Sequence, residues 1–430
     1  MNKFFNNNQI NTALLSLVGL GLCYKVNIGN LLLIIAAVYT LFFTKKSFIR
    51  LKSIAIGFPL LFFFITIISA LYSKDKNEGI GHLDLMLLMV LVVIPYLSQN
   101  LEFKNVKKVV NFFFYSISLG TFILLLLSIA KYVNGQDFSE ITFHGFTRLY
   151  DQHPVYYSMY IVFALYTQIT SYKIKFNNKF IELIPISILV AGLLLCASKA
   201  VIVVFTIMFF TRVFLIIKSI RQKVYISISV LAFVILTYSI PFLNERFNSG
   251  LTFSSEILSF KPTNDFTNKK LFSYDEKENI SDLEIRYIFA KIMLYHFLKD
   301  DILIFGYGQG DVQNYTDYYN FSYNLGPRWY EGYNVHNQYI YILITYGLFV
   351  LILFLLYICY SFYYAIKHRN HLYIFFLIIS SFVFFFEVTL VRNKGIVFFY
   401  FFNTLFLISH IYFENSNSRH KRSPKSSRRV

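Results

Sequence analysis

Five cationic or titratable side chains stand out because each borders on, or interrupts, a long apolar stretch. They are His153, Lys199, Arg286, His336 and Arg392. Lysine and arginine neutralise anions, and the forked guanidinium of arginine suits the oxygens of a phosphate or carboxylate. An imidazole titrates near neutral pH and therefore suits proton transfer. These residue types together suit an anionic substrate next to which a proton is removed.

Two of the histidines lie where apolar helices are expected to begin. His153 precedes Pro154, a favoured first residue of a helix, so it either starts that helix or faces a substrate. His336 and Asn337 open the segment VHNQYIYILITYGLFV. A helix start offers free backbone N–H groups and a positive dipole end to an anion. His336 is therefore either a general base beside such a site, with Asn337 in substrate binding, or a plain helix-start residue.

Two further charges allow both a structural and a functional interpretation. Lys199 lies in the short turn CASKA between two apolar stretches, and either reaches toward lipid headgroups or faces a polar cavity. Glu387 lies late in an apolar stretch, just before Arg392 and Lys394. It either pairs with one of these cations or takes part in function. We include Lys199 and Arg392 among the expected substrate-binding residues.

A glycine-rich turn and a cluster of tyrosines precede His336. The turn IFGYGQGD contains Gly306 and Gly308, which we expect to contribute to substrate binding. It lacks the Lys-Ser/Thr of a phosphate loop and follows a predicted helix rather than a strand, so it is a weak signal by itself. Residues 306–335 include seven tyrosines among 30 residues, against 34 in the whole chain of 430. Such rings suit sugar faces but also an interfacial aromatic belt.

The elements that position these residues must lie in a membrane. Of the 430 residues, 56% are hydrophobic and 15% are charged, and the mean hydropathy is +0.53. Ordinary soluble domains have roughly a quarter charged residues, so this composition excludes a soluble globular enzyme and a disordered chain. The sequence predicts an all-α polytopic membrane protein with about 12 transmembrane helices. The predicted segments are 10–26, 29–44, 53–72, 82–98, 108–131, 154–171, 180–197, 200–217, 223–242, 338–364, 371–390 and 395–413.

The distribution of lysine and arginine predicts the orientation. With the N-terminus in the cytoplasm, the inner loops and both termini hold 23 of these residues and the short outer loops hold eight. The first segment resembles a signal peptide, but we expect a retained helix because no cleavage site follows. The net charge of +17 therefore reflects topology. No base-reading motif accompanies it, and we expect no nucleic-acid partner.

Four regions follow from this topology: transmembrane helices 1–9 in 1–242, a periplasmic loop in 243–337 between the ninth and tenth helices, transmembrane helices 10–12 in 338–413, and a basic cytoplasmic tail in 414–430. In the loop, LEIRYIFAKIMLYHFLKDD predicts an amphipathic helix at the outer membrane face. The polar residues 415–430 are expected to be disordered. They anchor the topology or rest on anionic lipid.

The pattern resembles the O-antigen ligase and O-antigen polymerase superfamily. The resemblance rests on an Arg-bearing helix (Arg286), GYGQGD, VHNQYIYILITYGLFVLILF and FEVTLVRNKGIVFFYFF, together with twelve predicted spans and one large outer loop. It implies metal-independent, inverting glycosyl transfer from an undecaprenyl-pyrophosphate-linked glycan. The acceptor is lipid A–core in ligases and another repeat unit in polymerases, and the sequence does not distinguish the two.

The resemblance also implies residue roles and a location. His336 would be the base on the acceptor hydroxyl, and Arg286 would bind the departing pyrophosphate. The family often has Ser-Arg where this chain has Ser198-Lys199. Lys199 would therefore keep the positive charge but lack the forked guanidinium of arginine. The protein would lie in the inner membrane, among its lipids, with the active site facing the periplasm.

Two absences and one alternative complete the expectation. No acidic or His/carboxylate cluster accompanies the cations, and Cys23, Cys196 and Cys359 lie far apart, so we expect neither a metal site nor a cofactor. The alternative function is a transporter or flippase of a lipid-linked oligosaccharide. A transporter would more often have broken midplane helices, internal repeats and charges deep in several spans.

Overall fold

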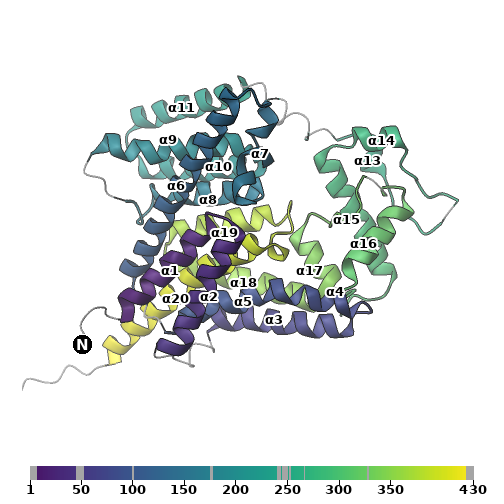
Figure 1. Cartoon of the computed structure of the whole chain (residues 1–430), viewed down its shortest axis with the longest axis horizontal. Helices are drawn as coiled ribbons and strands as arrows, with labels where there is room; N and C mark the ends of the chain where they lie inside the picture. Colours follow the sequence, from purple (N-terminus) through teal and green to yellow (C-terminus); the bar gives the residue numbers. More distant parts are fainter. Residues whose placement is uncertain are drawn as a thin grey trace, which may run out of the picture.

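The chain folds into a helical bundle with a smaller helical lobe at one end (Figure 1). The computed structural model describes residues 7–44, 53–98, 101–174, 178–239, 244, 250, 253–265, 267–326 and 329–422. Every regular element among these residues is a helix, which confirms the all-α class.

Each of the twelve predicted apolar segments contains at least one helix. The bundle consists of α1 (Asn7–Leu22), α2 (Val26–Phe43), α3 (Ile54–Tyr72), α4 (Lys76–Gly81), α5 (Leu83–Val93), α6 (Phe103–Val133), α7 (His144–Thr147), α8 (Pro154–Thr167), α9 (Lys179–Cys196), α10 (Lys199–Ile216), α11 (Ile220–Ser239), α17 (Gln338–Tyr346), α18 (Leu348–Lys367), α19 (His371–Val383) and α20 (Asn393–Arg422). Short 3₁₀ turns connect some of them, at Ile94–Ser98, Phe138–Glu140, Arg148–Tyr150 and Thr389–Val391.

Seven stretches in the described part of the chain are long and apolar enough to cross a membrane. They are Val26–Phe43, Ile54–Tyr72, Lys76–Ser98, Phe103–Val133, Lys199–Ile216, Leu348–Lys367 and Asn393–Tyr412. Three shorter apolar helices, Gln9–Leu22, Ile181–Cys196 and His371–Val383, complement them. The chain is thus a helical membrane protein, while the number of twelve crossings and the periplasmic position of the loop stay predictions.

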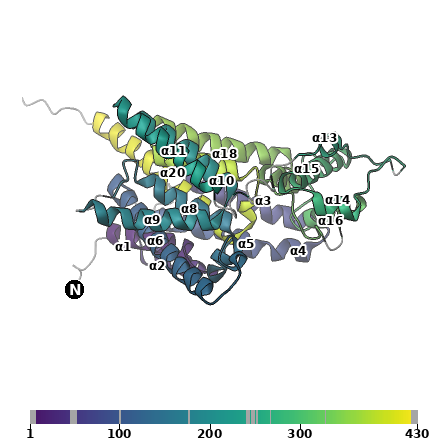
Figure 2. The same ribbon diagram turned by 90° about the horizontal axis from the view of Figure 1, so that it is seen from above.

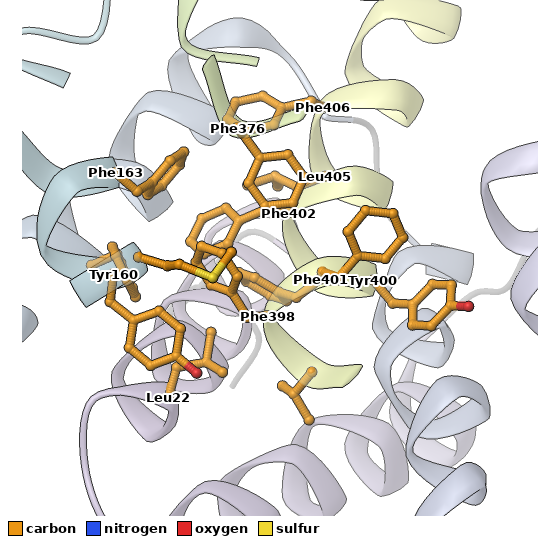
Figure 3. Close-up of a cluster of buried hydrophobic side chains, with 14 of the residues drawn as sticks. Leu22, Tyr160, Phe163, Phe376, Phe398, Tyr400, Phe401, Phe402, Leu405 and Phe406 are labelled. Atoms are coloured by element: carbon orange, nitrogen blue, oxygen red, sulfur yellow. The ribbon is translucent and has the colours of Figure 1, made fainter. Parts of the chain in front are cut away.

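Helix α20 lies at the centre of the bundle because its aromatic side chains pack in several directions. Of the span Asn393–Tyr412, 83% is buried, against 17–50% in the other six. Figure 3 shows phenylalanines of α20 packed against rings from α8 and α19 and against Leu22 of α1. The labelled side chains are Leu22, Tyr160, Phe163, Phe376, Phe398, Tyr400, Phe401, Phe402, Leu405 and Phe406. Burial on this scale, at roughly 25 cal/mol per Å² of apolar surface, fixes the bundle around one axis.

The lobe has a hydrophobic cluster of its own. The helices of the lobe are α13 (Ser255–Ser259), α14 (Tyr274–Asn279), α15 (Asp282–Lys299) and α16 (Val312–Ser322). Residues of α13, α15 and α16 belong to this cluster. Helix α15 begins with a capping box, in which Ser281 and Glu284 bond each other's backbone N–H groups. In both views the lobe lies at the end of the bundle opposite the start of α1 and the end of α20 (Figures 1 and 2).

The apolar face of α15 differs from its expected position at a membrane surface. Ile288, Phe289, Ile292, Met293 and Phe297 are completely buried in the cluster of the lobe. The predicted helix itself is present, as α15. The apolar face, however, packs against the rest of the loop, because the tyrosine-rich segment that follows supplies enough buried surface to cover it.

Two other segments depart from the expected boundaries. The tail was expected to be disordered from residue 415, yet α20 continues to Arg422, since neither glycine nor proline interrupts it; residues 423–430 lie outside the described part. The predicted span 371–390 ends as a helix at Val383, which leaves Glu387 in the connection to α20.

The predicted tenth span is broken at Gly347. This glycine has φ of +87°, and a Cβ atom there would lie 1.9 Å from the carbonyl oxygen of Ile304. Residues 303–308 lie beside the break, where Tyr307 N–H donates to Ile344 O (2.7 Å) and Leu348 N–H donates to Leu303 O (2.8 Å). Glycine is required because only it combines a positive φ with so close an approach. The break therefore attaches the lobe to the bundle.

Candidate active site

A polar pocket of about 850 Å³ lies where the loop residues next to α17 meet the bundle. Three of the predicted site residues, His153, His336 and Arg392, line it although they are far apart in the sequence. Its other lining residues are Val26, Ser139, Glu140, His144, Gly145, Arg148, Asp151, Gln152, Tyr156, Asn334, Glu387, Val388, Asn393 and Lys394. The structure thus brings together a base candidate and cations, as expected.

Glu387 connects the two predicted catalytic residues. Its Oε1 accepts a hydrogen bond from Arg286 Nη2 at 3.1 Å, and its Oε2 lies 3.5 Å from His336 Nδ1. The second distance is an ion-pair contact, longer than a hydrogen bond. The side chains of Arg286, Glu387 and His336 are 25%, 15% and 20% exposed, so water screens the interaction only in part. The carboxylate thus faces the imidazole from its Nδ1 side.

The neighbours of Glu387 keep it ionised. Burial alone would raise the pKa of this carboxyl. The nearby His336, His153 and Arg286 outweigh burial and hold the pKa of Glu387 below its ordinary value. The site therefore contains a fixed negative charge at neutral pH.

Each nitrogen of the Arg286 guanidinium donates a hydrogen bond within the protein. Besides Glu387, its guanidinium donates to Phe386 O (3.1 Å, from Nε) and to Asp282 O (2.5 Å, from Nη1). All three nitrogens thus have partners, and Arg286 does not line the pocket. Nη1 and Nη2 each keep a second N–H group, so the expected contact with a pyrophosphate stays a prediction, while in this structure Arg286 holds Glu387 and the backbone before it.

His336 has a strained backbone that its neighbours maintain. Its φ is +46°, in the left-handed region that residues other than glycine seldom adopt. Its N–H donates to Asn334 Oδ1 at 2.9 Å, which closes a tight turn just before α17. The ring lies 6.5 Å from Phe289 and 5.6 Å from Tyr333, measured between ring centroids. The base candidate is thus placed by the lobe and by the turn before α17.

The start of α17 differs from the expected anion site. Asn337 is the N-cap, and its Oδ1 accepts the N–H groups of Tyr339 and Ile340 at 3.0 Å each. The N–H of Gln338 donates to Phe384 O at 2.7 Å. All three N–H groups that could hold phosphate oxygens are therefore occupied, and Asn337 has a capping role. This expectation is wrong because the sequence itself supplies the cap.

The predicted glycine turn is also structural in this fold. Gly306 and Gly308 have φ of +73° and +96° and lie against the α17–α18 break and Ser73, outside the pocket lining. Gly308 N–H donates to Thr345 O, while the N–H groups of Gln309 and Gly310 donate to the hydroxyls of Ser69 and Ser73. The turn therefore connects the lobe to α3 and α17 rather than presenting N–H groups to a ligand.

His153 lines the bundle side of the pocket in a neutral form. Its Nδ1 accepts the N–H of Val155 at 3.3 Å, so it is also the N-cap of α8. This hydrogen bond leaves the proton of the neutral ring on Nε2. Burial lowers the pKa of His153 to about 4, which keeps it uncharged at physiological pH. His153 is thus a helix-start residue that also lines the pocket, and its part in substrate binding stays a prediction.

The two remaining cations differ in position. Arg392 is exposed at the pocket, and among the described residues its side chain has no hydrogen-bond or ion-pair partner. Lys199 opens α10 outside the pocket lining, and its Nζ lies beside Gly250, where a Cβ atom would come within 2.4 Å of it. Asp282, at the start of α15, is the next neighbour of the same glycine. Lys199 therefore lies near the Arg286 end of the site.

The described residues include no group of three or more His, Cys, Asp or Glu side chains that could hold a metal ion. The acidic and basic side chains that line the pocket are those of His144, His153, His336, Glu140, Asp151, Glu387, Arg148, Arg392 and Lys394.

Residues 184–355 match the family model described as O-antigen ligase. The superfamily relationship predicted from the sequence is confirmed for this region. The match covers the stretch from α9 into α18, including Lys199, Arg286 and His336. It supports glycan transfer of the O-antigen ligase or polymerase type in general, with glycans as partners. No curated protein matches the chain.

Glu387, which lies outside the matched region, is the main residue of the candidate site whose pairing the sequence did not reveal. Arg392 and Lys394 were the expected partners because they follow in the next turn. The structure pairs it with Arg286, 101 residues away. The available signal was an acid in an apolar stretch, which marks a site but not its partner.

Proposed function

We propose that the protein transfers a glycan from an undecaprenyl-pyrophosphate-linked donor to an acceptor hydroxyl, at the periplasmic face of the bacterial inner membrane. The acceptor is either lipid A–core or a growing polysaccharide. The observation that supports this best is the arrangement Arg286–Glu387–His336 at the edge of the pocket that Arg392 also lines.

In this proposal His336 is the general base. Its Nδ1 faces Glu387, so Nε2 is the nitrogen that takes the proton of the acceptor hydroxyl. The acceptor oxygen forms a bond to the anomeric carbon as the bond to the pyrophosphate oxygen breaks, and the pyrophosphate leaves with the electron pair. Glu387 stabilises the imidazolium that forms.

The leaving pyrophosphate requires positive charge that the protein has not already neutralised. Arg392 meets this requirement because it is exposed at the pocket and its side chain lacks a partner in the described part of the chain. A forked guanidinium can bond two phosphate oxygens at once. We assign Arg392 as the principal pyrophosphate contact, with Arg286 and Lys199 adding to the positive potential on the lobe side. No step of this scheme uses a metal.

The broken tenth helix does not favour the alternative of a transporter. The carbonyl and N–H groups released at Gly347 are taken up by residues 303–308, so the break offers no open binding site. A flippase would alter the sidedness of the lipid-linked glycan, whereas a transferase alters its covalent linkage.

The test is transfer in vitro with purified lipid-linked donor and acceptor. We expect His336→Ala and His336→Gln to lose roughly 10²–10⁴-fold in rate while the protein stays in the membrane at normal level. His82→Gln changes a half-buried histidine outside the pocket; it serves as the matched control and should transfer normally. Substantial turnover by His336→Gln at equal protein level would exclude the base assignment.

The type of acceptor is decided in cells. Deletion of the gene followed by gel analysis of surface polysaccharide would leave lipid A–core without polymer if the protein is a ligase. A product with a single repeat unit would identify a polymerase.

A further inference from the structure

Four aromatic rings form a continuous row on the lobe that ends at His336. Tyr274 lies 5.4 Å from Trp329, Trp329 lies 6.5 Å from Tyr330, and Tyr330 lies 5.6 Å from Tyr333, all between ring centroids. Tyr333 in turn lies 5.6 Å from the ring of His336. We call Tyr274, Trp329, Tyr330 and Tyr333 the aromatic row.

The aromatic row differs from the tyrosines inside the lobe. Tyr307 and Tyr319 are buried, and both hydroxyls donate to Asp300. Tyr274 and Tyr333, at the two ends of the row, are 62% and 44% exposed. Exposed rings at this density are unfavourable in water unless a ligand covers them.

The segment that carries most of the row is held rigidly. The N–H of Gly332 donates to Asp317 Oδ1 at 3.0 Å, and Gln313 Nε2 donates to Tyr333 O at 3.3 Å. Asp317 and Gln313 belong to α16, so this helix holds the loop. At its end, Asn334 and His336 line the pocket. The row is therefore continuous with the candidate active site.

An aromatic ring face that lies beside groups able to hydrogen-bond is a favourable binding surface for a carbohydrate. Sugars present flat C–H faces that pack on aromatic rings, and their hydroxyls bond polar neighbours. A lipid-facing belt would instead place aromatic rings at the ends of spanning helices. The aromatic row comes from α14 and from the 329–333 loop, and it contains no residue of the candidate spans.

We propose that the aromatic row binds the saccharide chain beyond the sugar that reacts, so that the glycan extends from the pocket along the lobe toward α14. This inference rests on the proposed function, because it takes His336 as the reacting end. It assigns to the lobe the task of holding an oligosaccharide rather than a single sugar.

The chain offers a direct probe, because Trp329 is its only tryptophan. The experiment titrates the full-length protein in detergent with oligosaccharides of two or more repeat units, released by mild acid from the surface polysaccharide of the producing bacterium. We expect a saturable change in Trp329 fluorescence.

Tyr274→Ala and Tyr333→Ala should each weaken binding roughly tenfold, the loss expected for one removed ring contact. The matched control is Tyr318→Ala, which removes an exposed tyrosine of α16 outside the row and should bind normally.

Three results would overturn the inference: no saturable signal with the wild-type protein, equal affinity in the Tyr274, Tyr333 and Tyr318 variants, or a signal with phosphatidylcholine vesicles and none with oligosaccharide. The last outcome would assign the row to the membrane. The proposed function fails separately. Saturable binding by a wild-type protein that transfers no glycan would refute the transferase but retain the saccharide site, and His336→Ala should lose transfer while it keeps the fluorescence response.

Discussion

Replacing Glu387 by glutamine removes the negative charge between Arg286 and His336 while it preserves the size of the side chain. An imidazolium and a carboxylate 3.5 Å apart attract each other by roughly 5 kcal/mol at an effective dielectric constant of about 20. Both side chains are partly exposed, at 20% and 15%, so screening reduces this value. We expect about 2–3 kcal/mol to be lost where the imidazolium forms, which corresponds to a fall in kcat of roughly 30–150-fold.

The assay is in vitro transfer at saturating donor and acceptor, with protein level and thermal stability measured for each variant. Glu387→Asp keeps the charge but shortens the side chain, so its kcat should lie between those of the wild type and Glu387→Gln. Glu278→Gln, on the exposed side of α14, removes the same charge elsewhere in the lobe and should leave kcat unchanged. Wild-type kcat in Glu387→Gln, with normal stability, would refute the role of the carboxylate in the site.

Four further outcomes are expected. Transfer should continue in EDTA, and a loss that magnesium or manganese restores would contradict this. Lys199→Arg should keep or raise activity, since the charge stays and a fork is gained, whereas Lys199→Ala should lose it; wild-type transfer by the alanine variant would show that the charge is dispensable. Gly347→Ala should lower the melting temperature far more than Gly135→Ala, because both have a positive φ but only the first brings a Cβ against a carbonyl oxygen; equal shifts would contradict the steric argument. Burial lowers the pKa of His296 to about 4. Its imidazole therefore takes up a proton near pH 6.5 in the unfolded chain, whereas in the folded lobe it stays neutral at that pH. Stability of the lobe, measured by limited proteolysis, should therefore fall by roughly 3 kcal/mol between pH 6.5 and 4, and less in His296→Gln.

The helices were predictable because each needs a long apolar stretch, which a sequence shows directly. The convergence of His153, His336 and Arg392 followed from topology, since alternate loops of a polytopic chain meet at one face. The cap at Asn337 was also predictable: asparagine directly before an apolar stretch is a common helix start, and that signal argued against free N–H groups there.

Other features depend on contacts that the sequence does not encode locally. The break at Gly347 lies inside an uninterrupted apolar stretch, and it becomes necessary only because residues 303–308 approach it. The choice of Arg286 over Arg392 or Lys394 as the partner of Glu387 depends on where the lobe lies relative to the bundle. The burial of α15 likewise depends on the tyrosine-rich segment that folds over it.

The two separate hydrophobic clusters have a consequence for how the protein fails when heated. Val335 and Val388, next to His336 and Glu387, belong to the cluster of the lobe, whereas Tyr156 at the opposite wall of the pocket belongs to the cluster of the bundle. Two such clusters can melt at different temperatures. Glycan transfer would then be inactivated when the smaller lobe opens, while the helical signal in circular dichroism, which comes mostly from the bundle, stays nearly intact. Heat inactivation would therefore measure the cohesion of the lobe rather than that of the membrane helices.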